Sequence, residues 1–227
     1  MVLALGLAAP LSAAPIAGTL NLVGNVTVSA TSIDWSDGLV PNIVGVTSGT
    51  GYFTDLAEPL PGLSYAQAID LTAGNPPPVA NFLHDFVDAD ESDAPNKYDN
   101  LNFDLTQIVA PVAPACTGGE AVNVSCSIGV FTLKNTGGGN VDITMDIRGV
   151  WQNTGDTDTP AVGIYTAQSA DTSIAAIRNT LLSGGSLTNS YSATITSVPE
   201  PATLLTFGAG SMLLAAHRRR RAAKAKA

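Results

Sequence analysis

Regular alternation of apolar and polar residues over 141–151 constrains the fold more than any other feature of the chain. The apolar positions are Val141, Ile143, Met145 and Ile147, and the polar positions between and after them are Asp142, Thr144, Asp146 and Arg148. Successive side chains of a β-strand point to opposite faces of its sheet. The segment therefore predicts a strand with one buried face and one solvated face.

Weaker alternation of the same kind predicts further short strands, at 20–28, 43–47, 66–71, 101–108, 128–133, 162–166 and 191–196. Three consecutive glycines within 134–140 allow the positive φ angles of a hairpin loop. A short helix is predicted over 172–182, with Ile174, Ile177 and Leu181 at helical spacing on its apolar face, capped by Asp171 or Thr172 and ended by Gly184. Many short strands with glycine and proline turns favour an all-β fold, a single antiparallel β-sandwich of jelly-roll or immunoglobulin-like type over 15–196.

Charge is unevenly distributed along the 227 residues, whose formal net charge is −9. All 19 acidic residues lie at or before Glu200, whereas six of the ten basic residues lie in the last ten positions. Residues 1–201 therefore carry a net charge of −15, and the tail carries +6. Because such an acidic body repels phosphate backbones, we expect no nucleic-acid partner for it.

The N-terminal residues 3–14 form an apolar stretch of secretory h-region length that ends in small residues. We expect 1–14 to be a signal peptide that signal peptidase removes after Ala13 or Ala14, and a proline after Ala14 favours the earlier bond. No basic residue precedes the apolar stretch, since the first in the chain is Lys97. The expectation is therefore a signal peptide truncated at its N-terminus, and the alternative is a buried first strand.

Near the C-terminus, residues 202–216 are uncharged, and they are followed by His217 and the arginines Arg218, Arg219, Arg220 and Arg221. As a helix this segment would span roughly 22 Å, against about 30 Å for the core of a bilayer. The arginines favour a marginal transmembrane helix with its basic tail, 217–227, in the cytoplasm and the acidic body outside. A C-terminal core helix is the alternative, which the adjacent arginines disfavour.

A proline-rich tetrapeptide, 198–201, stands directly before this predicted helix. Pro199 and Pro201 flank Glu200 and disfavour both a helix and a central strand, so the tetrapeptide predicts an extended joint. Pro-Glu-Pro, a short helix rich in alanine, leucine and glycine, and a terminal arginine cluster occur here in that order. This arrangement resembles the PEP-CTERM sorting signal and would occupy 197–227.

The resemblance implies recognition by an exosortase, a membrane-embedded protease similar to cysteine transpeptidases, which cuts near Pro199, Glu200 and Pro201. It also implies a precursor held transiently in the inner membrane with its body in the periplasm. The mature form would then reside at the outer envelope or in an extracellular polysaccharide matrix.

Two cysteines, Cys116 and Cys126, enclose nine residues. Export places them in an oxidising compartment, where an even pair of cysteines predicts a disulfide. The spacing is not that of a redox motif, and two cysteines cannot complete a zinc site.

The densest polar stretch, 84–99, offers weak calcium ligands, namely Asp88, Asp90, Asp93 and Asp99. Several of its oxygen-bearing residues follow the spacing of a calcium loop, but Asp93 stands where the turn of that loop requires glycine. We therefore expect a solvated acidic loop and no cofactor, with a looser calcium site as the alternative.

Evidence for catalysis is slight, and we expect no enzyme. His84 is the single histidine outside the tail, and no Gly-x-Ser-x-Gly motif is present. Trp35 and Trp151 could form a platform for sugar rings, although both fit the period-two pattern of core residues. The sequence thus favours an exported surface or matrix protein with a structural or interaction role. The alternatives are a polysaccharide-binding module, assisted by calcium or not, and a polysaccharide hydrolase.

Overall fold

The computed structural model describes residues 14–36, 40, 42–57, 64–74, 76–88 and 97–198. These residues form twelve strands, one α-helix and one short 3-10 helix, η1 (Asp55–Ala57). The α-helix is α1 (Ile174–Leu182). The strands are β1 (Gly18–Val28), β2 (Ser32–Ser36), β3 (Ile43–Gly51), β4 (Tyr65–Ala68), β5 (Leu71–Thr72), β6 (Val79–Val87), β7 (Asn102–Ile108), β8 (Ser125–Ile128), β9 (Phe131–Gly137), β10 (Asn140–Gln152), β11 (Thr159–Ser169) and β12 (Leu187–Ser197).

The predicted β-sandwich is wrong, because the sheet closes on itself. Among the described residues, eight strands form an antiparallel barrel in the order β11-β12-β1-β3-β4-β6-β7-β10, and β10 returns to β11. The closing pair joins β7 to the second half of β10, where Ile147 lies opposite Ile108 and Trp151 opposite Phe103. In the part of this half that the structure describes, this pairing leaves no free strand edge, so the sheet surrounds one core instead of splitting into two layers.

The other half of the sheet is open, because its longest strands change partners along their length. β1 pairs with β3 in its first half and with β2 in its second half, where Val26 lies opposite Trp35. β10 likewise leaves β7 and pairs with β9, with Ile143 opposite Leu133. β5 extends the β2 side and β8 extends the β9 side, which leaves two separate flaps. We call this half the open end and the barrel half the closed end.

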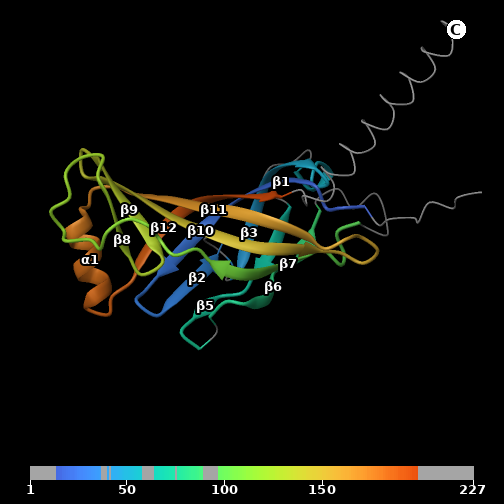
Figure 1. The fold of residues 1–227 in the computed structure, drawn as a ribbon, viewed down its shortest axis with the longest axis horizontal. Helices are drawn as coiled ribbons and strands as arrows, with labels where there is room; N and C mark the ends of the chain where they lie inside the picture. Colours follow the sequence, from blue (N-terminus) through green and yellow to red (C-terminus); the bar gives the residue numbers. More distant parts are fainter. Residues whose placement is uncertain are drawn as a thin grey trace, which may run out of the picture.

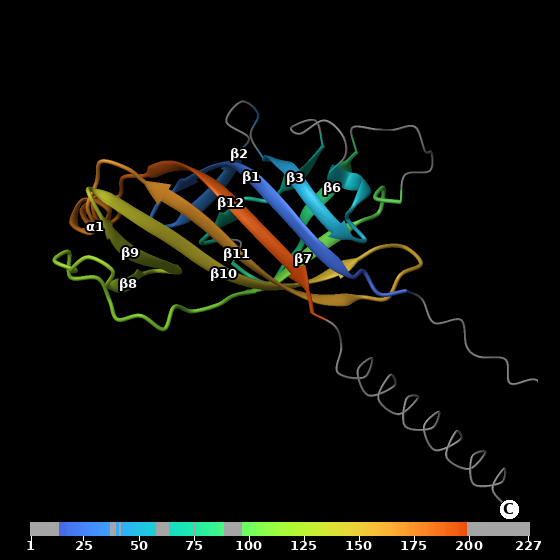
Figure 2. The same cartoon turned by 90° about the horizontal axis from the view of Figure 1, so that it is seen from above.

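α1 lies at the open end, where it contacts β9 and β12 (Figures 1 and 2). It begins two residues later than predicted, and its N-cap is Ser173, whose hydroxyl accepts a hydrogen bond of 3.2 Å from the backbone nitrogen of Ala176. The predicted apolar face is correct, since Ile174, Ile177 and Leu181 are buried. This face covers one side of the core at the open end.

Aromatic side chains dominate the core of each half. In the closed end Trp151 packs against Phe53 and Phe103, with ring centroids 4.8 Å apart in both pairs. In the open end the ring centroid of Trp35 lies 4.7 Å from that of Tyr165 and 5.3 Å from that of Tyr191. Trp35 and Trp151 are 1% and 0% exposed, so neither can serve as a surface platform for sugar rings.

Both ends of the described chain leave from the closed end, opposite α1 (Figure 2). The hydroxyl of Ser197 donates a 2.6 Å hydrogen bond to the carbonyl of Ile16, and Thr19 pairs with Thr196. Within the described part of the chain, no helix has the length and apolar character needed to cross a membrane. The predicted C-terminal hydrophobic helix, 202–216, lies outside the described residues.

Candidate functional site

The structure contains the disulfide predicted between Cys116 and Cys126, with an S–S distance of 1.98 Å. It ties the segment before β8 to β8 itself, and the backbone nitrogen of Cys116 donates to the carbonyl of Ser127. The carboxylate of Glu120 lies near both sulfurs. Because both sulfurs are consumed by the disulfide, they are not thiolate ligands and this group does not form a metal site.

Glu120 instead stabilises its own loop. Its carboxylate accepts hydrogen bonds from the backbone and hydroxyl of Thr117 and from the backbone nitrogen of Gly118. Desolvation opposes ionisation, but these hydrogen bonds outweigh it and hold the pKa of Glu120 below its ordinary value.

The structure describes two of the four predicted calcium ligands. Asp88 is buried just after β6, and Asp99 is exposed in the turn before β7. Asp90 and Asp93 lie outside the described residues. Among the described residues, neither Asp88 nor Asp99 lies in a cluster of three or more possible metal ligands. Calcium binding therefore stays a prediction.

His84 lies on β6 opposite Gln67 of β4. Its Nε2 atom is 3.9 Å from the carboxylate of Asp85, beyond hydrogen-bonding distance, and its Nδ1 atom is buried without a partner. A general base oriented by a carboxylate needs a direct hydrogen bond between the two, so this pair does not have the geometry of a catalytic triad.

A polar network joins three loops at the closed end. The hydroxyl of Tyr52 donates to Asp156 at 2.8 Å and accepts from Asn153, and Asn153 also donates to the carbonyl of Lys97. Lys97 in turn donates to Asp55 at 2.6 Å. Burial chiefly raises the pKa of Tyr52 to about 12, so this phenol stays protonated and acts as a donor in the network.

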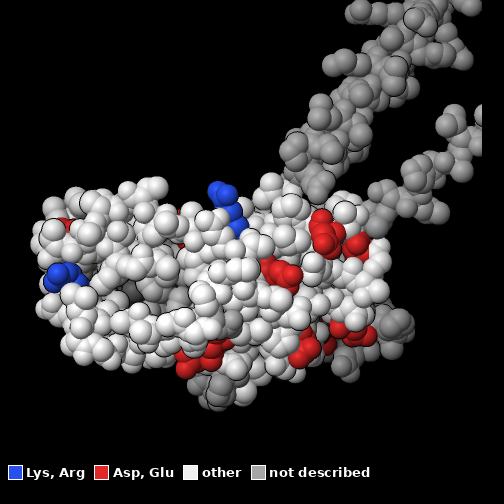
Figure 3. All heavy atoms as spheres, turned by 60° about the horizontal axis from the view of Figure 1, so that its bottom comes forward, with Lys and Arg blue, Asp and Glu red and all other residues white. Residues whose placement is uncertain are grey.

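Among the described residues, an opening with a mostly apolar lining lies at the open end, between the two flaps. It is a groove of about 430 Å³ bounded by the β1–β2 turn, β5, the β8–β9 turn and the last turn of α1. Figure 3 shows this face of the molecule hollowed toward the end that carries α1, with uncharged residues around the hollow. The apolar side chains along the groove include Leu71, Pro76, Pro77, Ile128, Val130, Phe131, Leu181 and Leu182.

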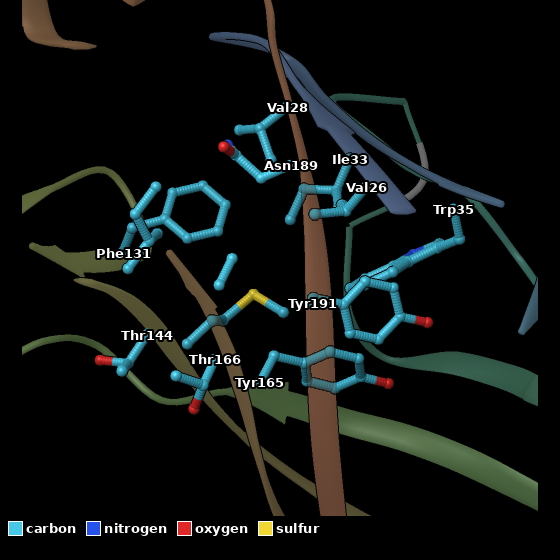
Figure 4. A pocket seen from close by; sticks show the side chains of 13 residues that line it. Val26, Val28, Ile33, Trp35, Phe131, Thr144, Tyr165, Thr166, Asn189 and Tyr191 are labelled. Atoms are coloured by element: carbon cyan, nitrogen blue, oxygen red, sulfur yellow. The ribbon is translucent and has the colours of Figure 1, made fainter. Parts of the chain in front are cut away.

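A small, partly open cavity of about 30 Å³ adjoins the groove, which is space for about two water molecules. Ile33 and Phe131 line both the groove and the cavity, so these two side chains separate them. In Figure 4 Phe131 lies on one side of the cavity, and Trp35, Tyr165 and Tyr191 lie together on the other. We call the groove and the cavity together the open-end site.

Trp35 and Tyr191 line the cavity with their rings, while Nε1 of Trp35 and the hydroxyl of Tyr191 are buried and have no hydrogen-bond partner in the described structure. Burial raises the pKa values of Tyr165 and Tyr191 well above the ordinary value, so both phenols are neutral. The cavity is therefore uncharged and apolar over most of its surface, and its polar lining residues are Thr144, Thr166 and Asn189.

Sequence reasoning missed the open-end site. Leu181 was recognised as part of the buried face of α1, but its neighbour Leu182 is 67% exposed and lines the groove. The one feature of the sequence that indicated this site is a leucine on the polar side of an amphipathic helix, at its last residue. That signal does not reveal that Leu71 and Phe131, far away in sequence, lie in the same groove.

One comparison with known proteins found a match. The profile of the PEP-CTERM protein-sorting motif matches residues 197–221. The chain carries a PEP-CTERM protein-sorting motif. No curated protein and no solved structure matches the chain, so the body has no assigned relative.

The PEP-CTERM match supports an exported protein with a membrane-anchored precursor that an exosortase, a membrane protease, processes. The predicted motif residues Pro199, Glu200 and Pro201 and the cluster Arg218, Arg219, Arg220 and Arg221 fall within the match but outside the described residues. Ala13 also lies outside them, and Ala14 is the first residue that the structure describes.

The PEP-CTERM motif begins where the folded body ends. Its first residue, Ser197, is the last of β12 and is buried. The next residue, Val198, still donates a backbone hydrogen bond of 2.7 Å to the carbonyl of Pro160. Cleavage after this point would therefore leave every strand of the barrel intact.

Proposed function

We propose that this chain is an exported cell-surface or extracellular-matrix protein that is processed through its PEP-CTERM motif, and that its barrel is a non-catalytic interaction domain. The observation that carries the proposal is the opposite placement of two features. The motif starts at Ser197 of the closed end, whereas the groove lined by Leu71 and Leu182 lies at the open end. A precursor held by its C-terminus thus has its groove away from the point of attachment.

A binding role fits the chemistry of the open-end site. The groove has the size of small-molecule sites, which range over roughly 300–1,000 Å³ and are mostly apolar. None of the described residues that line it is charged, and two described groups that could act in proton transfer lie elsewhere. His84 is on β6, and Tyr52 belongs to the network at the closed end. These placements favour recognition over catalysis.

Sorting is tested by replacing Glu200 with alanine in the producing cells. We expect the full-length precursor to accumulate in the inner membrane, because the motif match includes this residue. Fractionation and immunoblotting of the native chain provide the measurement, and Asp99→Ala, which removes an exposed carboxylate of the body, is the matched control. Unchanged release of the Glu200→Ala protein would refute processing through the motif. Deletion of the arginines 218–221 should have the same effect as Glu200→Ala.

The non-catalytic role is tested on the mature protein purified after export. Incubation with extracellular polymer from the producing cells should release no reducing ends or other soluble products. Steady product formation that scales with protein concentration, and that disappears when one carboxylate is replaced, would refute an interaction role and favour a hydrolase.

A further inference from the structure

We propose that the open-end site binds one molecule of a small, uncharged, hydrocarbon-bearing ligand, such as a long-chain alcohol or ester. This inference rests on the proposed binding role of the barrel and names the chemistry of its ligand. The hydrocarbon chain would lie along the groove, with its end directed past Phe131 toward the aromatic cavity.

The lining selects the ligand by polarity. Of the residues that border the groove, the majority are apolar, and the polar ones are serines and threonines without charge. An ionised group placed there would lose its hydration without gaining a charged partner, which is costly. Burial of a hydrocarbon in the same groove is favourable because it removes apolar surface of both partners from water.

The position of the cavity next to the groove favours a slender small molecule over a protein. Ile33 and Phe131 separate the two spaces, and Phe131 is only half-buried at the start of β9. Rotation of one side chain at this turn would join them. A folded partner could cover the groove, but a cavity of about 30 Å³ beside Trp35, Tyr165 and Tyr191 admits only a slender group.

The lining of the cavity also includes one amide side chain, that of Asn189. An amide can both donate and accept a hydrogen bond. A hydroxyl or ester oxygen of the ligand could pair with it, which pure hydrocarbon could not.

Charge and position exclude two other occupants. The body carries a net charge of −15 up to residue 201, so it repels anionic amphiphiles such as free fatty acids. The chain's own apolar segment 202–216 is attached at the closed end, after Ser197. β12 alone separates this point from the open end by about 35 Å, at roughly 3.3 Å per residue.

Binding is tested on the mature protein with the neutral dye N-phenyl-1-naphthylamine, whose fluorescence rises in apolar sites. We expect saturable 1:1 binding, displacement by 1-dodecanol, and much weaker displacement by dodecanoate. Leu182→Asp introduces a charge at the mouth of the groove and should weaken dye binding about tenfold or more. Val112→Asp, at a fully exposed position that does not line the groove, is the matched control and should bind the dye as the unmodified protein does.

Each part of the proposal can fail separately. Dye binding that is absent, or equal in Leu182→Asp and Val112→Asp, would overturn the open-end site. Equal displacement by dodecanoate would overturn the preference for an uncharged ligand. Co-sedimentation with phosphatidylcholine vesicles without 1:1 dye binding would indicate a membrane surface instead of a single molecule. Product formation from extracellular polymer is measured independently, so it refutes the proposed function whatever the dye shows.

Discussion

Replacement of Gly149 by alanine tests the closure of the barrel directly. Gly149 lies on β10 at the register shift where this strand pairs with β7. A Cβ atom at this position would lie 2.2 Å from Cζ of Phe103 and 2.3 Å from the backbone oxygen of Asp104. The phenyl ring could turn aside only by disturbing Trp151, and the backbone oxygen belongs to the closing strand itself.

The expected magnitude follows from these contacts. Added methyl groups in a packed core cost typically about 1–3 kcal/mol, and a clash with backbone favours the upper end, about 3 kcal/mol. For a domain of this size each kcal/mol lowers the Tm by about 2–4 °C. Thermal unfolding followed by circular dichroism should therefore show a Tm about 6–12 °C lower for Gly149→Ala.

Gly119→Ala is the matched control, because a Cβ at Gly119 would meet no atom within 4 Å. Its free energy of unfolding should change by no more than about 0.5 kcal/mol. Phe103→Leu shortens the clashing side chain, so the double variant with Gly149→Ala should lose less stability than the sum of the two single variants. Equal melting of Gly149→Ala and Gly119→Ala would refute the pairing of β7 with β10.

Three further predictions concern other contacts. Replacing Cys116 and Cys126 together by serine should lower the free energy of unfolding by about 3 kcal/mol in urea titrations, because the disulfide closes a loop of about ten residues; an unchanged midpoint would contradict this. Burial chiefly raises the pKa of Tyr52 to about 12, above its ordinary value of 10.0, so the native state holds this proton more tightly than the unfolded chain. Stability present below pH 10 is therefore lost toward pH 12, and Tyr52→Phe should reduce that loss. Ser173→Ala should cost about 1 kcal/mol as a lost N-cap, whereas equal destabilisation by Thr172→Ala would contradict the assignment of Ser173.

Several strands were predictable because their alternation is local. β10 matches the predicted segment 141–151 closely, and β11 and β12 contain the shorter predicted segments 162–166 and 191–196, since one face of each strand is buried and the other solvated. The segment 128–133 was predicted as one strand, but Gly129, with φ of +56°, turns the chain between β8 and β9. β6 was missed because Asn81 and Asp85 adopt positive φ and interrupt its alternation.

The sites differ in how well they could be predicted from the sequence. The disulfide and the sorting motif depend on residues that are close together in the chain, and both were found without the structure. The open-end site depends on the β1–β2 turn, β5, the β8–β9 turn and α1, which are far apart in sequence. No local pattern marks residues that become neighbours only when two flaps of one sheet face each other.

The amino-acid sequence by itself determined the direction of the side chains along most strands, the apolar face of α1 and the sorting motif at residues 197–221. Tertiary structure alone decided between a sandwich and a barrel, because a period of two specifies which face of a strand is buried and not which strand lies beside it. That choice depended on where the long strands change partners: β1 passes from β3 to β2 between Val23 and Asn25, and β10 passes from β9 to β7 between Thr144 and Ile147. The same change of partners closes one end of the sheet and opens the other, and so places a groove where no single segment predicts one.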